Sequence, residues 1–172
     1  MIAESVTAVV AGLKEAGIDF IASLPCKSFA RLIFTIMDDP DFKHVAVGNE
    51  GDAIGICAGA WLGGKTPALV VENAGLVLAT YQLMDTIYFF GGFPMLLVLD
   101  HRGDFGDGAG YWYFGNAAMT PRILENLGIP YRIVSESHRF AAELLRAQQT
   151  TRALGKPAAV LFSGEEVFYD SL

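Results

Sequence analysis

The sequence predicts one α/β domain: a doubly wound, mostly parallel six-stranded sheet with helices on both faces. Short runs of consecutive apolar residues alternate along the chain with segments whose apolar positions recur at helical spacing. Glycine and proline mark where helices end and strands begin, as in Gly128-Ile-Pro130 and Gly155-Lys-Pro157. Helices that alternate with apolar strands are typical of an open sheet whose crossovers cover both faces.

The elements are assigned in chain order. Val6, Val9 and Leu13 lie on one face of a predicted helix over 3–16, which ends at Gly17. The continuous apolar run 19–24 predicts a strand buried on both sides. The same two patterns predict the rest: helix 28–37, strand 43–48, helix 50–62, strand 67–72, helix 75–88, strand 95–100, helix 119–127, strand 130–134, helix 137–153 and strand 157–162.

Polar side chains gather where the first four predicted strands end. Lys27 follows the first strand, Glu50 the second, Asn73 the third, and His101 and Arg102 the fourth. Ligands of open parallel sheets bind beyond the carboxyl ends of the strands. We therefore expect a binding site at this rim.

Composition narrows the class of protein. Hydrophobic residues make up 52% of the 172 residues and charged residues only 18%, which indicates that a partner subunit covers part of the surface. A net charge of −7 without a Lys/Arg cluster argues against a nucleic-acid partner. The sequence has no apolar run long enough to cross a membrane and no basic secretory head. Cys26 and Cys57 lack CxxC spacing, so we expect reduced thiols in the cytoplasm.

Several common chemistries lack their motifs. The first predicted strand is not followed by the glycines of a dinucleotide site, and Gly63-Gly-Lys-Thr66 follows a helix, whereas a phosphate loop follows a strand. The GxSxG motif of serine hydrolases is absent. Three scattered histidines form no metal-ligand pattern, and none is placed by sequence to activate Cys26.

Glu50 is the most informative residue, because the strand before it and the small-residue helix after it both read as buried. A buried acid needs a partner that compensates for its desolvation. Glu50 could cap the helix by accepting backbone N–H groups, or it could serve catalysis. The sequence by itself leaves both interpretations open.

The segment from Asn49-Glu-Gly-Asp-Ala53 to Glu72-Asn-Ala-Gly75 resembles the pyrimidine-binding (PYR) domain of thiamine diphosphate enzymes. Ser23-Leu-Pro-Cys26, Gly55-Ile-Cys-Ala-Gly-Ala60, Asp100-His-Arg-Gly103 and the stretch 120–131 resemble the sulfopyruvate and phosphonopyruvate decarboxylase group more narrowly. The resemblance spans nearly the whole chain. It implies that residues 1–172 form one PYR domain.

The resemblance assigns roles to the rim residues. It implies that Glu50 hydrogen-bonds a ring nitrogen of the cofactor's aminopyrimidine and stabilises its imino tautomer. It also implies contacts to thiamine diphosphate from Leu24, Pro25, Cys26 and Asn73. The expected reaction is decarboxylation of a 2-oxo acid.

A complete enzyme of this class also needs a diphosphate-binding (PP) domain, which holds the cofactor's Mg²⁺. Gly106-Asp-Gly108 mimics part of that domain's motif, but no suitably spaced Asn follows, and we interpret the triplet as a coincidental glycine turn. The resemblance therefore implies a PP-domain beta subunit on a separate chain, in a heterotetramer or larger assembly. No metal ligand is expected on this chain.

A doubly anionic 2-oxo acid needs cations at the rim, and Lys27 and Arg102 are the candidates; solvation and a loop carbonyl are their structural alternatives. His101 is expected to relay protons or to brace its loop. The loop 104–116 carries four consecutive aromatic residues, including Trp112. They could form a lid, a pocket for a bulkier aromatic 2-oxo acid, or part of a subunit interface.

Other functions remain open at this stage. A carboligase of the same cofactor class would use the same residues. A non-catalytic regulatory subunit would keep the fold without the chemistry, although retention of Glu50 argues against it. A flavodoxin-like nucleotide-binding module comes last, because a phosphate loop is missing.

Overall fold

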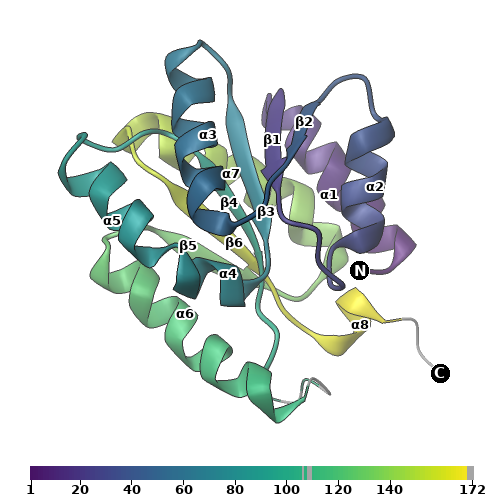
Figure 1. The fold of residues 1–172 in the computed structure, drawn as a ribbon. Coiled ribbons are helices and arrows are strands. Elements are labelled where there is room, and N and C mark those ends of the chain that lie inside the picture. Colours follow the sequence, from purple (N-terminus) through teal and green to yellow (C-terminus); the bar gives the residue numbers. More distant parts are fainter. Residues whose placement is uncertain (106, 108–109, 170–172) are drawn as a thin grey trace.

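The computed structural model describes residues 1–105, 107 and 110–169. These residues form a sheet of six parallel strands in the order β2-β1-β3-β4-β6-β5, so the predicted doubly wound α/β fold is confirmed (Figure 1). The strands are β1 (Phe20–Ser23), β2 (Lys43–Ala46), β3 (Pro67–Val71), β4 (Leu96–Asp100), β5 (Tyr131–Val134) and β6 (Ala158–Phe162).

Helices cover both faces of the sheet. One face carries α1 (Ala3–Glu15), α2 (Ala30–Asp38) and α7 (Phe140–Leu154), the last preceded by the 3₁₀ turn η2 (Ser137–Arg139). The other face carries α3 (Glu50–Leu62), α4 (Asn73–Leu78), α5 (Thr80–Tyr88) and α6 (Phe114–Asn126), which follows the 3₁₀ turn η1 (Tyr111–Tyr113). The short helix α8 (Glu165–Phe168) lies beside the start of the chain, where the Ile2 N–H donates to the Val167 carbonyl (3.0 Å).

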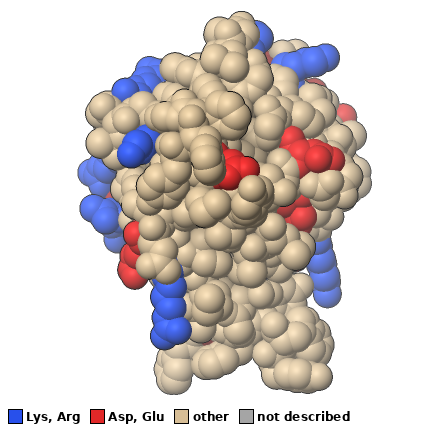
Figure 2. Space-filling view, turned by 60° about the vertical axis from the view of Figure 1, so that its left-hand side comes forward, with Lys and Arg blue, Asp and Glu red and all other residues tan. Residues whose placement is uncertain are grey.

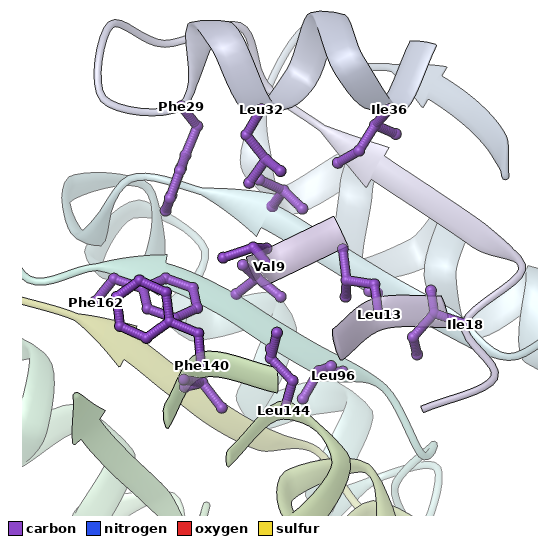
Figure 3. Close-up of a cluster of buried hydrophobic side chains, with 14 of the residues drawn as sticks. Val9, Leu13, Ile18, Phe29, Leu32, Ile36, Leu96, Phe140, Leu144 and Phe162 are labelled. Carbon is purple, nitrogen blue, oxygen red and sulfur yellow. The ribbon is translucent and has the colours of Figure 1, made fainter. Parts of the chain in front are cut away.

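Each face of the sheet has its own apolar core. Figure 3 shows the core under α1, α2 and α7, in which Phe140 and Phe162 pack with ring centroids 4.5 Å apart. Helices α1 and α7 approach closely because Gly12 has no Cβ; a Cβ there would lie 2.6 Å from the Ala141 Cα. The second core lies under α3 to α6. Together the two cores make β3, β4 and β6 buried along their whole length.

The strand before Glu50 is less buried than we predicted. β2 is an edge strand, and Lys43 and Ala46 are exposed while His44 and Val45 are half-buried. Its apolar run resembles that of a central strand, but β1 is its sole neighbour in the described sheet. The expectation that both neighbours of Glu50 are buried is therefore wrong for the strand.

The predicted helix 75–88 is two helices, α4 and α5, separated at Ala79. The Thr80 hydroxyl donates to the carbonyls of Leu76 (3.0 Å) and Val77 (2.9 Å), and such side-chain bonds compete with the backbone ladder. α4 also begins two residues earlier than predicted, directly after β3.

The predicted helix 119–127 begins earlier, at Phe114, and the aromatic run belongs to η1 and the start of α6. Pro121, near the start of the predicted helix, lies inside the observed one. Proline is usually excluded from helix interiors because it lacks an N–H, so the sequence rule placed the boundary too late. Helix α8 was not predicted.

Much of the surface is apolar. Figure 2 shows that uncharged residues cover most of the side formed by α5 and α6. Large exposed side chains there include Tyr81, Tyr88, Phe89 and Phe90 of the α5 region. Across the described residues, no helix combines the length and the apolar character that crossing a bilayer requires.

Candidate active site

The parallel sheet brings the predicted site residues to one rim. β1, β3 and β4 pair in parallel, so Cys26, Asn73 and His101 follow strands that end at the same edge. Contacts between the loops confirm that several of these segments meet: Asn73 contacts Asp100 and Arg102, and α4 contacts Glu50.

Glu50 begins α3 but does not cap it. The cap is Asn49, whose side-chain oxygen accepts the Asp52 backbone N–H (2.8 Å). Within the described part of the chain, the half-buried Glu50 carboxylate has no hydrogen-bond or ion-pair partner. The capping interpretation therefore does not explain this acid.

The Glu50 side chain packs against the backbone of Gly75. This glycine lies in the first turn of α4, and a Cβ at this position would be 2.6 Å from both Cγ and Oε1 of Glu50. Even alanine would therefore displace the carboxyl group. This contact is the direct link between the loops that follow β2 and β3.

Asp100 is a buried acid that the sequence analysis named in the Asp100-His-Arg-Gly103 motif but to which it gave no role. It is the last residue of β4, and its Oδ1 accepts the Asn73 backbone N–H at 2.7 Å. The pKa of its carboxyl is raised to about 6, chiefly by burial and to a smaller extent by the charge of Glu72. The nearby Ser28 hydroxyl, the hydrogen bond from the Asn73 N–H and the charge of Arg102 act in the opposite direction. An acid at the end of an apolar strand was the signal that could have identified it.

Asn73, a predicted cofactor contact, is fully buried. Its Nδ2 donates to the Arg102 carbonyl (2.9 Å), while its Oδ1 has no partner among the described residues. Beside it, the Ser28 hydroxyl donates to Glu72 Oε1 (3.4 Å). The amide and the two acids thus tie together the loops after β1, β3 and β4.

Cys26, another predicted cofactor contact, is half-buried, and burial raises the pKa of its thiol to about 12. It is therefore not a thiolate nucleophile at neutral pH. Leu24 is half-buried, and Pro25 and Lys27 are exposed on the same loop. In the described part of the chain, no hydrogen bond or ion pair joins these three side chains to Glu50, so their predicted roles stay predictions.

His101 is buried, and desolvation lowers its pKa although Asp104 and Asp107 oppose this effect. Its Nε2 lies 3.6 Å from Asp104 Oδ2. Its Nδ1 is buried without a hydrogen-bond partner in the described part of the molecule. One ring nitrogen therefore faces Asp104 and the other has no partner among the described residues. This arrangement is compatible with either predicted role, proton relay or support of the loop.

Arg102 is engaged inside this chain. Its Nε donates to Asp107 Oδ2 and its NH1 donates to the Tyr169 hydroxyl, both at 2.7 Å. The rings of Tyr113, Phe168 and Tyr169 surround the guanidinium, with centroids 4.8–5.7 Å from Cζ. Of the two predicted substrate cations, Arg102 is thus buried in a local network and Lys27 is the exposed one.

The aromatic segment 111–114 reaches this rim through Tyr113, whereas Trp112 is 64% exposed and packs edge-on against Tyr111 (5.2 Å). Gly106 and Gly108 of the Gly-Asp-Gly triplet lie outside the described residues. Asp107 between them is buried and accepts bonds from Arg102 and the Gly103 N–H. No cluster of three or more potential metal ligands occurs among the residues that the structure describes.

Comparisons with known proteins agree with the resemblance. No family model matches the chain. It is 32% identical over 130 residues to sulfopyruvate decarboxylase subunit alpha of Methanococcus maripaludis. The matched region covers 72% of this chain and 73% of that protein. It is 35% identical over 134 residues to the alpha subunit of the Methanothermobacter thermautotrophicus enzyme. That match covers 75% of this chain and 77% of the relative.

A solved structure shares the fold. The 2-oxoglutarate:ferredoxin oxidoreductase of Magnetococcus marinus superimposes with a TM-score of 0.70 over 98% of this chain, at 17% sequence identity. This chain spans 30% of that larger protein. At this identity the likeness concerns the fold alone.

Proposed function

Because the chain belongs to the family of sulfopyruvate decarboxylase alpha subunits, we propose that it is the PYR subunit of a two-component, thiamine diphosphate-dependent 2-oxo acid decarboxylase. The observation that carries this proposal is Glu50. Its carboxylate starts α3 at the rim of the sheet, is held against Gly75, and has no partner among the described residues.

The residues present fit the pyrimidine end of the cofactor. A partnerless carboxyl at the rim can hold a proton and share it with a ring nitrogen. Bound thiamine diphosphate would supply the electron sink for loss of carbon dioxide. Leu24, Pro25, Cys26 and Asn73 would line the ring from the loops after β1 and β3. His101, with its free Nδ1, would hold or move a proton beside it.

The proposed substrate is a sulfopyruvate- or phosphonopyruvate-like 2-oxo acid. Lys27 would attract its anionic groups, because it is exposed at the end of β1. Arg102 would contribute only after exchanging the Tyr169 hydroxyl for the anion. A bulkier aromatic 2-oxo acid is the alternative, with the exposed Trp112 as its contact.

The partner would be a PP-domain beta subunit that holds the diphosphate and Mg²⁺. The exposed apolar side chains of the α5 and α6 region support such a partner, since large exposed apolar patches mark interaction sites. The half-exposed position of Glu50 agrees with a site that a second chain completes. A heterotetramer or larger assembly is proposed.

The test measures carbon dioxide release from sulfopyruvate, phosphonopyruvate and phenylpyruvate by this chain mixed with its beta subunit, thiamine diphosphate and Mg²⁺. Glu50→Gln should lower the rate by about 10²- to 10⁴-fold, as expected for loss of a group that transfers protons. Asp52→Asn, which alters another acid of the same helical turn, is the matched control and should keep most activity. Full activity of Glu50→Gln, or activity of this chain without the beta subunit, would contradict the proposal.

A further inference from the structure

We propose that Asp100 is a positioning residue that sets the location of the Glu50 carboxyl through Asn73 and the first turn of α4. The two acids follow different strands, β2 and β4, and are far apart in the sequence. The inference rests on the proposed function of Glu50 and adds the mechanism by which this chain holds that carboxyl in place.

The first step is the bond between Asp100 and α4. Both Asp100 and Asn73 are fully buried, and the Asn73 N–H donates to Asp100 Oδ1 at 2.7 Å. The first N–H groups of a helix have no partner within the helix, so this carboxylate fixes where α4 begins. A bond from N–H to an ionised carboxylate is stronger than one between neutral groups.

A second bond prevents the first turn of α4 from rotating. The Asn73 Nδ2 donates to the Arg102 carbonyl at 2.9 Å, two residues beyond Asp100. Backbone and side chain of Asn73 are thus both attached to the end of β4. Because β4 is buried along its whole length, it is a rigid support for this turn.

The next step is the contact between α4 and Glu50. Gly75 lies two residues after Asn73, and the Glu50 side chain rests on the space that a Cβ would occupy. Cγ and Oε1 of Glu50 both lie 2.6 Å from that position. The Glu50 side chain therefore packs directly against the Gly75 backbone, so that a displacement of the first turn of α4 toward it would move the carboxyl group.

The polar and charged groups around Asp100 come from the loops that follow β1, β3 and β4. Ser28 follows β1, Glu72 and Asn73 follow β3, and Arg102 follows β4. Among the described residues, Asp100 Oδ2 and Asn73 Oδ1 are buried acceptors without a donor. Unpaired buried acceptors are costly, which is difficult to explain by stability alone and is typical of functional sites.

The test follows Glu50 directly by NMR of the side-chain carboxyl carbon in the full chain, without cofactor or substrate. Asp100→Ala removes the acceptor and Gly75→Ala inserts a methyl group, so both should shift the Glu50 signal. Asp100→Asn keeps an oxygen acceptor for the Asn73 N–H and should restore the wild-type signal. Ser23→Ala, which truncates another buried polar residue at a strand end, should leave it unchanged.

Kinetics of the complex with the beta subunit supply the second measurement. Asp100→Ala and Gly75→Ala should lower kcat by about 10- to 100-fold, as a misplaced catalytic group does, with KM nearly unchanged. Asp100→Asn should recover most of kcat. A merely structural role would lower the amount of folded protein instead, and circular dichroism measures that separately.

An unchanged Glu50 signal in Asp100→Ala, while Gly75→Ala shifts it, would overturn the proposal. A Glu50 signal that Asp100→Asn disturbs as much as Asp100→Ala would also overturn it. Failure of the proposed function has a different signature, because Glu50→Gln would then stay active whether or not the two acids are coupled.

Discussion

Arg102 shows how strongly the surroundings decide what one side chain does. Its Nε and NH1 are bonded to Asp107 and Tyr169, and three aromatic rings pack around it. Gly103 allows this arrangement, because its φ of +90° suits glycine and a Cβ there would collide with the Tyr113 carbonyl. The guanidinium therefore joins the β4 loop, η1 and the end of α8.

Asp100 predicts how stability depends on pH. Its pKa rises from 3.8 to about 6 in the folded protein, so the folded state binds this proton more tightly than the unfolded state. Asp100 therefore lowers the free energy of unfolding as pH increases from about 4 to about 6, and its effect is constant above that window. Urea unfolding of wild type and Asp100→Asn between pH 4 and 7 measures the difference. The stability of the variant relative to wild type should increase across this window, and a constant difference would contradict the shifted pKa.

Sequence patterns identified the rim residues but not their contacts. Glu50, Asn73, His101 and Arg102 were recognised because polar residues after apolar strands are conspicuous. Asp100 was quoted with its motif but given no role, because it belongs to the strand itself and its burial and its bond to Asn73 depend on tertiary structure. The bonds of Arg102 to Asp107 and Tyr169 depend on tertiary packing and have no local pattern.

At the scale of elements, α3 has an exposed face made of glycine. Gly55 and Gly59 are exposed, and a Cβ at either position would meet no atom of the described chain within 4 Å. Glycine inside a helix lowers stability relative to alanine. The isolated chain therefore does not explain why glycine occupies these two positions. Close packing of this helix face against a partner would explain it.

Gly55→Ala and Gly59→Ala should each raise the free energy of unfolding of the isolated chain by about 0.5–1 kcal/mol. Both should weaken binding to the beta subunit, because a methyl group separates two closely packed surfaces. Chemical unfolding and titration calorimetry measure the two effects. Gly12→Ala is the control: its Cβ would lie 2.6 Å from Ala141, so it should destabilise the chain. Unchanged binding by both α3 variants would show that this face is free in the complex.

Element boundaries were predictable where one signal dominates. α3 spans the predicted residues 50–62 because Asn49 caps it and glycines follow it. The boundaries at Ala79 and Phe114 were missed for a physical reason. Thr80 bonds backbone carbonyls, and Pro121 is tolerated inside α6, so tertiary context outweighs local propensity at both places.

At the scale of the whole molecule, the many apolar residues lie both in the cores and at the surface. Two cores account for the buried part, and a group of exposed aromatic residues lies near α5 and η1. Phe89 and Phe90 are 77% and 71% exposed at the end of α5. Exposed aromatic pairs of this kind are typical of the centre of a subunit interface.

Replacing Phe89 and Phe90 together by serine should weaken the complex with the beta subunit by at least about tenfold, since aromatic anchors carry much of the binding energy. The free energy of unfolding of the isolated chain should change by less than about 0.5 kcal/mol per residue, as for other surface positions. Phe34→Ser, which alters an exposed aromatic residue of α2 on the opposite face, is the control. Equal affinity of the double variant and wild type would place the interface elsewhere.

The strand order carries a consequence for biosynthesis. β5 is made before β6, yet in the described sheet it pairs with β6 alone, and β6 also pairs with β4. A nascent chain on the ribosome therefore displays β5 with an unsatisfied backbone, and β4 with one open edge, until β6 emerges and inserts between them. Pairing between distant segments is slow, and unpaired edges promote aggregation. The interval between the synthesis of β5 and that of β6 is thus when a chaperone would protect this protein most.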